Sequence, residues 1–417
     1  MQRRDLLALG SGSVMGGLLA SIPRADASDR QSGGSQAAGM LLSAADFGAA
    51  GDGRTDDTAA LQAAFERAFA TGSLLMIAPG EYRITRSLKI VLKDHITRQC
   101  GILAHGVRLV SVIQNGGDVI EIESRATVRF VLLQGLEIRG SGRDGHGINI
   151  HCEGNRKYFY NFCLRDIVIQ NCGGDGCRLS GNVFEGQMIN CYLRDNRGNG
   201  LTMAHERPEG ILSAIHVMGS VFGQNGHDGA AMIQGCYDVS FHGCYFLLNQ
   251  RFGLAAQHGC TLLSHCGFEN NHEGAEDFAA GRAGLWLQGF GALIGCTAYS
   301  VFKQTRLIEG YITSRLTMQG CSGSGGGRAR GAGLALLRGS KEGTATLIGC
   351  SGSVRYEQGF EGIEIGGAGG GLRCGSDWNS RNLPHLGEYR LWVDRDGRLR
   401  LKKGAPDRDD DGLPVGS

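Results

Sequence analysis

The sequence predicts an all-β fold in which short strands stack as a parallel solenoid. The chain has 417 residues, of which 41% are hydrophobic, and it contains 70 glycines but only 6 prolines. So much glycine without a Gly-x-y period indicates a chain that turns often and tightly. Short alternating strands recur about every 25 residues with no helical pattern between them, as a stack of coils requires.

Strands that open with glycine set this period. Alternation along each strand predicts that the residue after the glycine faces inward and the next one outward. The inward residues are therefore Ile148, Cys177, Leu201, Ala230, Leu254 and Leu285. The strands are GINIH at 147, GCRLS at 176, GLTMA at 200, GAAMI at 229, GLAAQ at 253, GLWLQ at 284, GYITS at 310, GLALL at 333 and GIEIG at 362.

Two ladders share the period. An asparagine that closes each strand tolerates a left-handed turn and can bond to its copy in the next coil. These asparagines are Asn171, Asn196, Asn225, Asn249 and Asn271, and the residues five positions earlier are Asp166, Cys191, Ser220, Cys244 and Cys266, continued by Cys296, Cys321 and Cys350.

The cysteines recur singly, which predicts buried free thiols. Fourteen cysteines in an exported chain would otherwise suggest disulfides, but these match the coil spacing and suit small inward positions. There is no C-x-x-C, and His205-Glu206 lacks the second histidine of a zinc motif because position 209 is glutamate. We therefore expect no metal centre.

The first 27 residues predict an export signal. A basic start at Arg3-Arg4, a weakly apolar middle and Ala25-Asp26-Ala27 fit a bacterial signal of the twin-arginine type, with an ordinary secretory signal as the alternative. Residues 28–44 would then be a flexible mature N-terminus. No later stretch has 18 uninterrupted apolar residues, so we expect no membrane anchor. The remaining basic and acidic residues balance, which disfavours a nucleic-acid partner.

The stretch DFGAAGDGRTDDTAALQAAF at 46–65 predicts a helix that caps the first coil. Thr55-Asp56-Asp57 provides a helix start with carboxylates in the first turn, and residues 58–70 carry an apolar side. A phosphate loop would need a lysine that is missing here. A cap would cover the apolar interior and free edge of the first coil.

This stretch, followed by LLMIAPGEYRI at 74–84, resembles the entry segment of the pectate-lyase superfamily, in its rhamnogalacturonase-like and epimerase-like branch. The resemblance covers roughly 41–390. It implies a right-handed parallel β-helix as the catalytic domain at 45–390, with a capping helix at about 56–70. Members cleave, eliminate or epimerise sugars in polysaccharides, and others are phage tail spikes. The resemblance therefore implies a polysaccharide substrate without fixing the reaction.

Outward polar residues along the strands from 147 to 290 predict a sugar-binding groove. An aromatic plate can stack on a pyranose while amides bond its hydroxyls, although a solvated sheet face is the alternative. The insertions HERPEGILSA and HEGAEDFAAGRA are expected to form groove walls. The predicted substrate-binding residues are His151, Asn199, Gln257, His258, Trp286 and Gln288.

Two chemistries stay open for this groove, neither of which requires a cofactor. Hydrolysis needs two carboxyl groups, and Asp175 and Asp228 lie two coils apart, roughly 10 Å, which is slightly longer than the range for inversion of roughly 6.5–9.5 Å; Glu206 lies between them and would complete a pair. The alternative for both aspartates is ordinary turn chemistry, since each precedes a glycine. Elimination or C5 epimerisation of a uronate needs a base and a cation, for which Arg178 and His205 are the candidates.

The resembled families match these residues only in part. Gly174-Asp175-Gly176-Cys177 lacks one aspartate of the polygalacturonase motif, and its Gly-His-Gly motif, at 145–147, lies on an earlier coil than in that family. Met203-Ala204-His205-Glu206 keeps only the His-Glu of the Asp-Pro-His-Glu run of alginate epimerases.

Residues 391–417 predict a hairpin turned at Asp396-Gly397, followed by a solvated acidic tail. The run Asp407-x-Asp409-x-Asp411-Gly412 matches the start of a calcium loop without its final glutamate, so Ca²⁺ binding is possible but not required. Similar ends occur in tail-spike-like proteins, which leaves a homotrimeric, non-catalytic carbohydrate-binding spike as a further reading.

Overall fold

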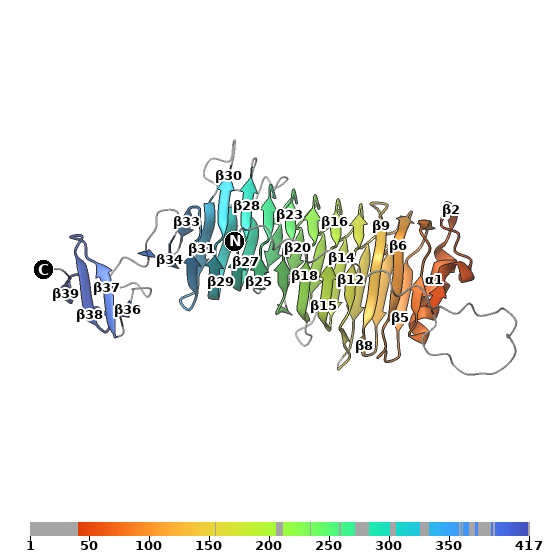
Figure 1. Cartoon of the computed structure of the whole chain (residues 1–417), viewed down its shortest axis with the longest axis horizontal. Coiled ribbons are helices and arrows are strands. Elements are labelled where there is room, and N and C mark those ends of the chain that lie inside the picture. The colour runs from red at the N-terminus through yellow and green to blue at the C-terminus, as the bar shows by residue number, and fades with distance from the viewer. Residues whose placement is uncertain are drawn as a thin grey trace, which may run out of the picture. The chain divides into compact units, whose positions relative to one another are not determined.

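The computed structural model describes residues 41–415 except for 155, 206–211, 234, 258–259, 272–282, 301–305, 326–332, 358–359, 361, 367–371, 374–384 and 387. Thirty-five strands form one continuous sheet that winds into stacked coils, and apart from its last pair every pairing is parallel (Figure 1). The predicted solenoid is therefore confirmed. The export signal and most of residues 28–44 lie outside the described residues.

Each coil contributes strands to three faces. Face A consists of β5 (Leu88–Leu92), β7 (Ile120–Ser124), β10 (Ile148–Cys152), β14 (Cys177–Gly181), β17 (Leu201–Ala204), β20 (Ala230–Met232), β24 (Leu254–Ala256), β31 (Gly333–Gly339), β33 (Val354–Tyr356) and the first parts of β27 (Ala283–Ile294) and β29 (Arg306–Gln319).

Face B follows face A along each coil, and the second parts of β27 and β29 continue onto it. Its other strands are β1 (Leu41–Ser43), β3 (Leu74–Met76), β8 (Val128–Arg129), β11 (Phe159–Tyr160), β12 (Cys163–Arg165), β15 (Val183–Ile189), β18 (Leu212–Met218), β21 (Cys236–Tyr237), β22 (Ser240–His242), β25 (Cys260–Ser264), β32 (Thr344–Ile348), β34 (Gly362–Ile365) and β35 (Leu372–Arg373).

Face C completes the coil. The long strands β6 (Cys100–Ser111) and β9 (Val131–Arg139) begin on face B and end on face C. The remaining strands of face C are β2 (Asp52–Asp56), β4 (Gly80–Ile84), β13 (Val168–Gln170), β16 (Tyr192–Arg194), β19 (Val221–Gly223), β23 (Tyr245–Leu247), β26 (Gly267–Glu269), β28 (Thr297–Ser300) and β30 (Ser322–Gly325).

A buried asparagine ladder holds the turn from face C to face A. The Nδ2 of Asn196 donates to Oδ1 of Asn225 at 3.0 Å, and Asn225 donates in the same way to Asn249 at 3.0 Å. Asn249 continues the ladder to Asn271 at 2.8 Å. All four side chains are almost fully buried, so the ladder satisfies polar groups that water cannot reach.

The ladder prediction was wrong by one residue in its first coil. Cys172, and not Asn171, takes the ladder position, because its N–H donates to Oδ1 of Asn196 at 3.1 Å. Asn171 is exposed and occupies the left-handed turn position with φ 61°. In the second ladder Ile167 likewise replaces Asp166, since the carbonyl of Ile167 accepts from the next coil's Tyr192.

The glycine that opens each face A strand is required by this ladder. A Cβ on Gly200 would lie 2.5 Å from the carbonyl oxygen of Gly229 and 2.8 Å from Nδ2 of Asn225. Gly229 meets the same pair of groups one coil later, at 2.5 and 2.8 Å. The glycine period and the asparagine period thus have one cause, which is the close approach of successive coils at this corner.

The second ladder places thiols at the turn from face B to face C. The Sγ of Cys191 donates to the carbonyl of Leu164 at 3.5 Å, and Cys244 donates to Val217 at 3.4 Å. All twelve cysteines that the structure describes are free, and ten of them are buried. Burial raises the pKa of Cys191 to about 12, so the thiol stays protonated and inert. The prediction of buried free thiols is confirmed for these ten residues, whereas Cys163 and Cys350 are free but only half-buried.

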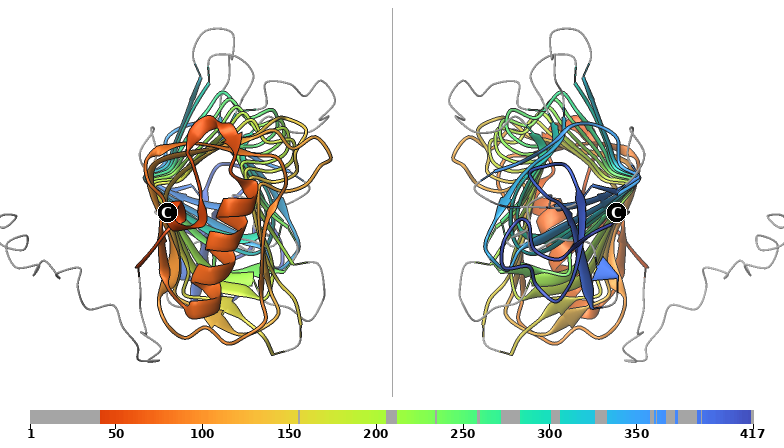
Figure 2. Two further views of the ribbon diagram at one scale, coloured as in Figure 1. Left: turned by 90° about the vertical axis from the view of Figure 1, so that its right-hand side faces the viewer. Right: turned by 90° about the vertical axis from the view of Figure 1, so that its left-hand side faces the viewer.

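The helix α1 (Thr58–Thr71) lies across the N-terminal end of the solenoid (Figure 2). It buries one side, including Leu61, Phe65 and Phe69, as predicted. The predicted carboxylates of its first turn are absent, because Asp57 precedes the helix and accepts the N–H of Ala50 at 2.6 Å. The short 3-10 helix η1 (Ala44–Phe47) precedes it. In the described residues, no helix combines the length and the apolarity needed to cross a membrane.

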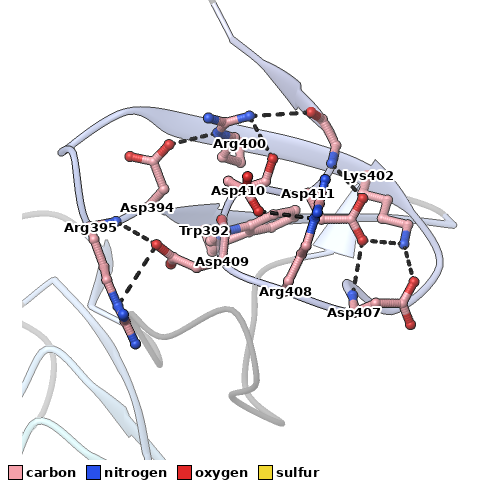
Figure 3. A network of polar contacts seen from close by, with 11 residues as sticks. Trp392, Asp394, Arg395, Arg400, Lys402, Asp407, Arg408, Asp409, Asp410 and Asp411 are labelled. Atoms are coloured by element: carbon pink, nitrogen blue, oxygen red, sulfur yellow. Dashed lines mark hydrogen bonds and ion pairs between the residues drawn. The ribbon is translucent and has the colours of Figure 1, made fainter.

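A separate antiparallel sheet forms from residues 385–414. It contains β36 (His385–Leu386), β37 (Tyr389–Val393), β38 (Leu399–Lys403) and β39 (Leu413–Pro414). The predicted hairpin turn is confirmed, with Gly397 at φ 78°. The acidic stretch after the hairpin is folded back on it and is not a free tail, while Asp407 and Asp410 remain exposed to solvent as predicted (Figure 3).

Side chains of the hairpin, Lys402 and Trp392, bind this acidic stretch. Nζ of Lys402 donates to Asp411 at 2.5 Å and to Asp407 at 2.8 Å, which puts an ammonium between two carboxylates of the calcium-like run (Figure 3). Nε1 of Trp392 donates to the carbonyl of Asp409 at 2.7 Å. Two of the three aspartates that a calcium ion would use are therefore already bonded to one lysine.

The last three predicted face A strands were placed out of register. Leu285 pairs with Ile308, so the strand at this coil begins near Arg306 and Gly310 lies inside it. Gly333 pairs with Arg306, one position before the expected one. GIEIG at 362 belongs to face B, where Gly362 pairs with Ala345.

Candidate functional site

The outward side of face A carries three columns of side chains that run from coil to coil. The predicted inward residues are all fully buried in the core. The rim column, just before the strands, is Asp118, His146, Asp175, Asn199, Asp228, Phe252, Ala283 and Arg306. The middle column is Asn149, Arg178, Thr202, Ala231, Ala255, Trp286, Glu309 and Leu336, and the far column is His151, Ser180, Ala204, Ile233, Gln257, Gln288, Tyr311 and Arg338.

Side chains of the rim column accept backbone hydrogen bonds from the next coil. Oδ1 of Asp175 accepts the N–H of Asn199 at 2.8 Å, and Oδ1 of Asn199 accepts the N–H of Asp228 at 2.8 Å. Oδ1 of Asp228 in turn accepts the N–H of Phe252 at 2.9 Å. Three residues predicted to act on substrate thus also tie the coils together, and each aspartate has one carboxylate oxygen committed to that bond.

The second oxygen of Asp175 faces two nitrogens. Oδ2 lies 3.5 Å from Nδ1 of His146 and 3.6 Å from Nη1 of Arg178. Nδ1 of His146 accepts the N–H of Asp175 at 2.9 Å, which requires that nitrogen to carry no proton. The predicted cation Arg178 is therefore placed beside a carboxylate, whose negative charge it stabilises.

Asp228 occupies a different environment two positions further along the column. Its side chain is only 4% exposed. Burial raises the pKa of Asp228, and the charge of Asp175 adds to this effect, while Arg251 at 3.6 Å, the N–H of Phe252 and His227 lower it by less. The neutral acid is therefore favoured in Asp228. Two coil spacings separate it from Asp175, about 10 Å.

Several predicted sugar contacts are already engaged within the protein. Nδ1 of His151 lies 2.8 Å from Oγ of Ser180, which is buried. Nδ2 of Asn199 donates to Oγ1 of Thr202 at 2.9 Å. Gln257 is half-buried and Gln288 is exposed, in the first and second coils after Asp228.

Some predicted residues are not brought into this cluster. His205 is half-buried and lies just after β17. Glu206, His258 and most of both predicted insertions lie outside the described residues.

A second polar cluster lies on face A in a later coil, and the sequence reasoning missed it. We call Trp286, Arg306, Glu309, Tyr311 and Arg338 the Glu309 cluster. Its central carboxyl is 3% exposed, and Oε2 is buried without a hydrogen-bond partner in the described structure. Its Oε1 forms an ion pair with Nη2 of Arg338 at 3.8 Å.

Burial raises the pKa of Glu309, and the nearby Glu357 adds to that effect. The charges of Arg306 and Arg338 lower it by less. The alternation from Ile308 to Ile312 could have revealed this cluster, because it places Glu309 and Tyr311 on the outward side. The expected strand start at Gly310 concealed it.

A small apolar cluster separates the two polar clusters. Phe252 and Trp286 stack with ring centroids 6.3 Å apart and planes 30° apart, against Ala255 and Ala283. Trp286 is half-buried, so part of its ring remains open at the surface. Along the axis of the solenoid, face A therefore presents first the two aspartates, then the pair of Phe252 and Trp286, and then the Glu309 cluster.

Two other features do not belong to this site. A cavity of about 660 Å³ lies between α1, β5 and the loop at 93–98, and none of the predicted site residues lines it. Across the described part of the chain, no group of three histidine, cysteine or acidic residues is arranged to hold a metal ion.

Comparisons with known proteins agree with this architecture. Residues 41–97 match the family model described as rhamnogalacturonase A/epimerase, pectate lyase-like, and residues 110–297 match the right-handed β-helix region. The first match covers the capping segment and the second covers the coils with both aspartates. No curated protein matches the chain in sequence.

Solved structures share the fold at low sequence identity. ORF18 of Geobacillus virus E2 aligns with a TM-score of 0.54 and 18% identity over 88% of this chain and 68% of that one. The catalytic unit of a GH87 α-1,3-glucanase from Streptomyces thermodiastaticus gives 0.51 and 15% over 79% and 69%. The Dettilon tailspike protein gives 0.50 and 12% over 76% and 69%. At these identities the likeness establishes the fold alone.

Proposed function

The chain belongs to the pectate-lyase-like superfamily of right-handed β-helix proteins, and we propose that it is an exported enzyme that cleaves glycosidic bonds of a uronate-containing polysaccharide on face A. Asp228 acts as the acid and Asp175 as the base. One observation carries the proposal, which is that two carboxyls stand in one column, each beside an arginine nitrogen at 3.6 Å, and that Asp228 is the more deeply buried, with a side chain 4% exposed against 10% for Asp175. Burial raises the pKa of Asp228, and a neutral acid in the same site as a second carboxyl is how one site provides an acid and a base at the same pH.

Each carboxyl has a role that follows from its surroundings. Asp228 is buried, so its neutral form is favoured and its proton can pass to the glycosidic oxygen as the bond breaks. Asp175 faces Arg178, which stabilises a carboxylate able to take a proton from water. A separation of about 10 Å is slightly longer than the range for inversion of roughly 6.5–9.5 Å and twice the distance for retention, so of the two outcomes inversion is the one we propose.

A β-elimination is the second candidate, favoured by the contact between Arg178 and Asp175 at 3.6 Å. In that reaction the Asp175 carboxylate takes the proton next to the uronate carboxylate, and Arg178 neutralises the charge that develops there. Arg178 then acts as the cation that the sequence predicted, while the base is Asp175 and not His205. A C5 epimerisation would begin with the same proton transfer.

The test follows product chemistry on acidic and neutral polysaccharides. New reducing ends without the ultraviolet band of an unsaturated uronate support hydrolysis, and both signals together support elimination. Asp228→Asn should remove cleavage. Asp118→Asn is the matched control, because Asp118 accepts a rim bond from His146 at 2.6 Å but lies outside the proposed pair. Failure to cleave any substrate would overturn the proposal and favour an epimerase or a binding spike.

A further inference from the structure

Glu309 presents an unusual combination for a side chain on a sheet surface. It lies in the middle column of face A, pointing away from the apolar core, and yet is 3% exposed. Its Oε2 has no hydrogen-bond partner among the described residues. Buried carboxyl oxygens are normally paired, because an unpaired one costs about 1–3 kcal/mol. A natural chain keeps such a group most readily where a ligand supplies the partner.

The neighbours of Glu309 have the chemistry of a sugar site. Trp286 pairs directly with Glu309 in the previous coil. Tyr311, two residues along the same strand and therefore on the same side, is 37% exposed. Partly open aromatic rings of this kind stack on pyranose faces. Gln288 pairs with Tyr311, which adds an amide for hydroxyl groups.

Arg338 gives the cluster a charge preference. It pairs with Tyr311 in the next coil, and its side chain is 29% exposed. Its contact with Glu309, at 3.8 Å, is longer than a hydrogen bond, so the guanidinium is not fixed by that carboxyl. With Glu309 favoured in its neutral form, Arg338 is a cation beside an uncharged acid. Guanidinium groups bind carboxylates in bidentate geometry.

We propose that the Glu309 cluster is a binding subsite for an acidic sugar unit of the polysaccharide. Arg338 binds the carboxylate of that unit, the rings of Trp286 and Tyr311 hold its pyranose, and Glu309 donates a hydrogen bond to it as Arg338 turns toward the ligand. The inference rests on the proposed function, which places the cleaved bond beside Asp228. Arg306 of the cluster lies three positions after Asp228 in the rim column, about 14 Å away, so the subsite would bind a sugar unit of the same polysaccharide chain.

The experiment measures binding separately from cleavage. Full-length Asp228→Asn protein, which cannot cleave if the proposed acid is correct, is titrated with tetramers of galacturonate and of mannuronate and with a neutral cello-tetraose, by calorimetry. Arg338→Gln should weaken binding of an acidic tetramer by about tenfold or more, because a charge-assisted hydrogen bond contributes about 1.5–3 kcal/mol. Tyr311→Ala should weaken it as well. Cello-tetraose should bind weakly and be unaffected by Arg338→Gln.

A matched control removes a nearby charge without touching the cluster. Arg315→Gln lies on the same strand at an exposed position of the second half of β29 and should leave binding unchanged. Glu309→Leu, which fills the space without a polar atom, should also weaken acidic binding while the protein still melts cooperatively.

The outcomes separate the subsite from the reaction. If cleavage is never seen but acidic tetramers bind and Arg338→Gln weakens them, the subsite stands and the proposed reaction fails. If cleavage occurs but Arg338→Gln and Tyr311→Ala bind acidic tetramers like the parent protein, the subsite is wrong. No binding of either acidic tetramer also overturns it.

Discussion

Asp228 and Glu309 are both buried carboxyls on the outward side of face A, but only Asp228 is hydrogen-bonded into the solenoid. Asp228 stands at a turn, where the N–H of Phe252 is available to its Oδ1 at 2.9 Å. Glu309 stands within a strand that pairs on both sides, so neighbouring backbone groups are already used in the ladders. A turn can therefore satisfy a buried carboxyl with local backbone donors, whereas a central strand leaves it to side chains or to a ligand.

The largest effect expected along this comparison is the loss of cleavage in Asp228→Asn. Removing a general acid should lower kcat by about 10²- to 10⁴-fold. The amide oxygen of asparagine can still accept the N–H of Phe252, so the melting temperature should not fall. Reducing-end assays and calorimetric melting check both statements. A variant that melts much earlier would show that the carboxylate is needed for the fold.

The activity of the parent protein should depend on pH in a direction set by Asp228. Its pKa is raised, so the proton required for catalysis is held above the usual range of an aspartic acid and is lost as pH rises through that value. kcat should fall on the alkaline side by about tenfold per pH unit once Asp228 is ionised. Asp118→Asn should keep the same pH profile, and a flat profile on the alkaline side would rule out Asp228 as the acid.

Removing a buried asparagine of the ladder should destabilise the protein, although the ladder lies outside the proposed active site. Asn225→Ala removes the acceptor of Asn196 and the donor to Asn249, both buried. Unsatisfied buried polar groups cost about 1–3 kcal/mol each, so the loss should be about 3 kcal/mol in urea unfolding. Asn171→Gly is the control, because Asn171 is exposed and has φ 61°, which glycine adopts freely. Equal losses in the two variants would contradict the ladder.

Glu309→Gln, in contrast, should stabilise the protein at alkaline pH. The pKa of Glu309 is raised in the folded state, so the folded protein holds a proton that the unfolded chain releases, and stability falls as pH rises between the two values. Glutamine removes that loss, so the variant should have a higher melting temperature than the parent at pH 8 and a similar one at pH 4. Thermal melts at both pH values provide the measurement. A variant less stable at pH 8 would show that the ionised carboxylate is paired.

The smallest effect concerns the C-terminal sheet. Lys402 already bridges Asp407 and Asp411, so added Ca²⁺ should leave the melting temperature of the parent protein unchanged. Lys402→Ala frees both carboxylates and should make melting sensitive to Ca²⁺. Lys403→Ala, in the neighbouring exposed position, is the control and should stay insensitive. A calcium shift in the parent protein would mean that the ion displaces the lysine.

The sequence predicted the coil architecture well because its cause is local and repeats. A Cβ at Gly200 cannot fit beside the next coil, so glycine and the asparagine ladder recur wherever that corner does. The prediction failed at Gly310, a glycine that lies inside a strand, and the register error hid Glu309. The rim bonds of Asp175 and Asp228 were also not predictable, since an aspartate before glycine gives no indication of which backbone N–H lies opposite in the next coil.

If the protein is exported, as we propose, the column of inner thiols should make its unfolding difficult to reverse. In the folded state burial keeps Cys191 protonated, and its neighbours in the column, Cys244 and Cys266, are buried as well. Unfolding would expose these cysteines together and return them to an ordinary reactivity, and an oxidising compartment would then promote random disulfide pairing. Recovery after heating should therefore depend on added reductant, and the working lifetime of the protein should be set by how rarely its coils open.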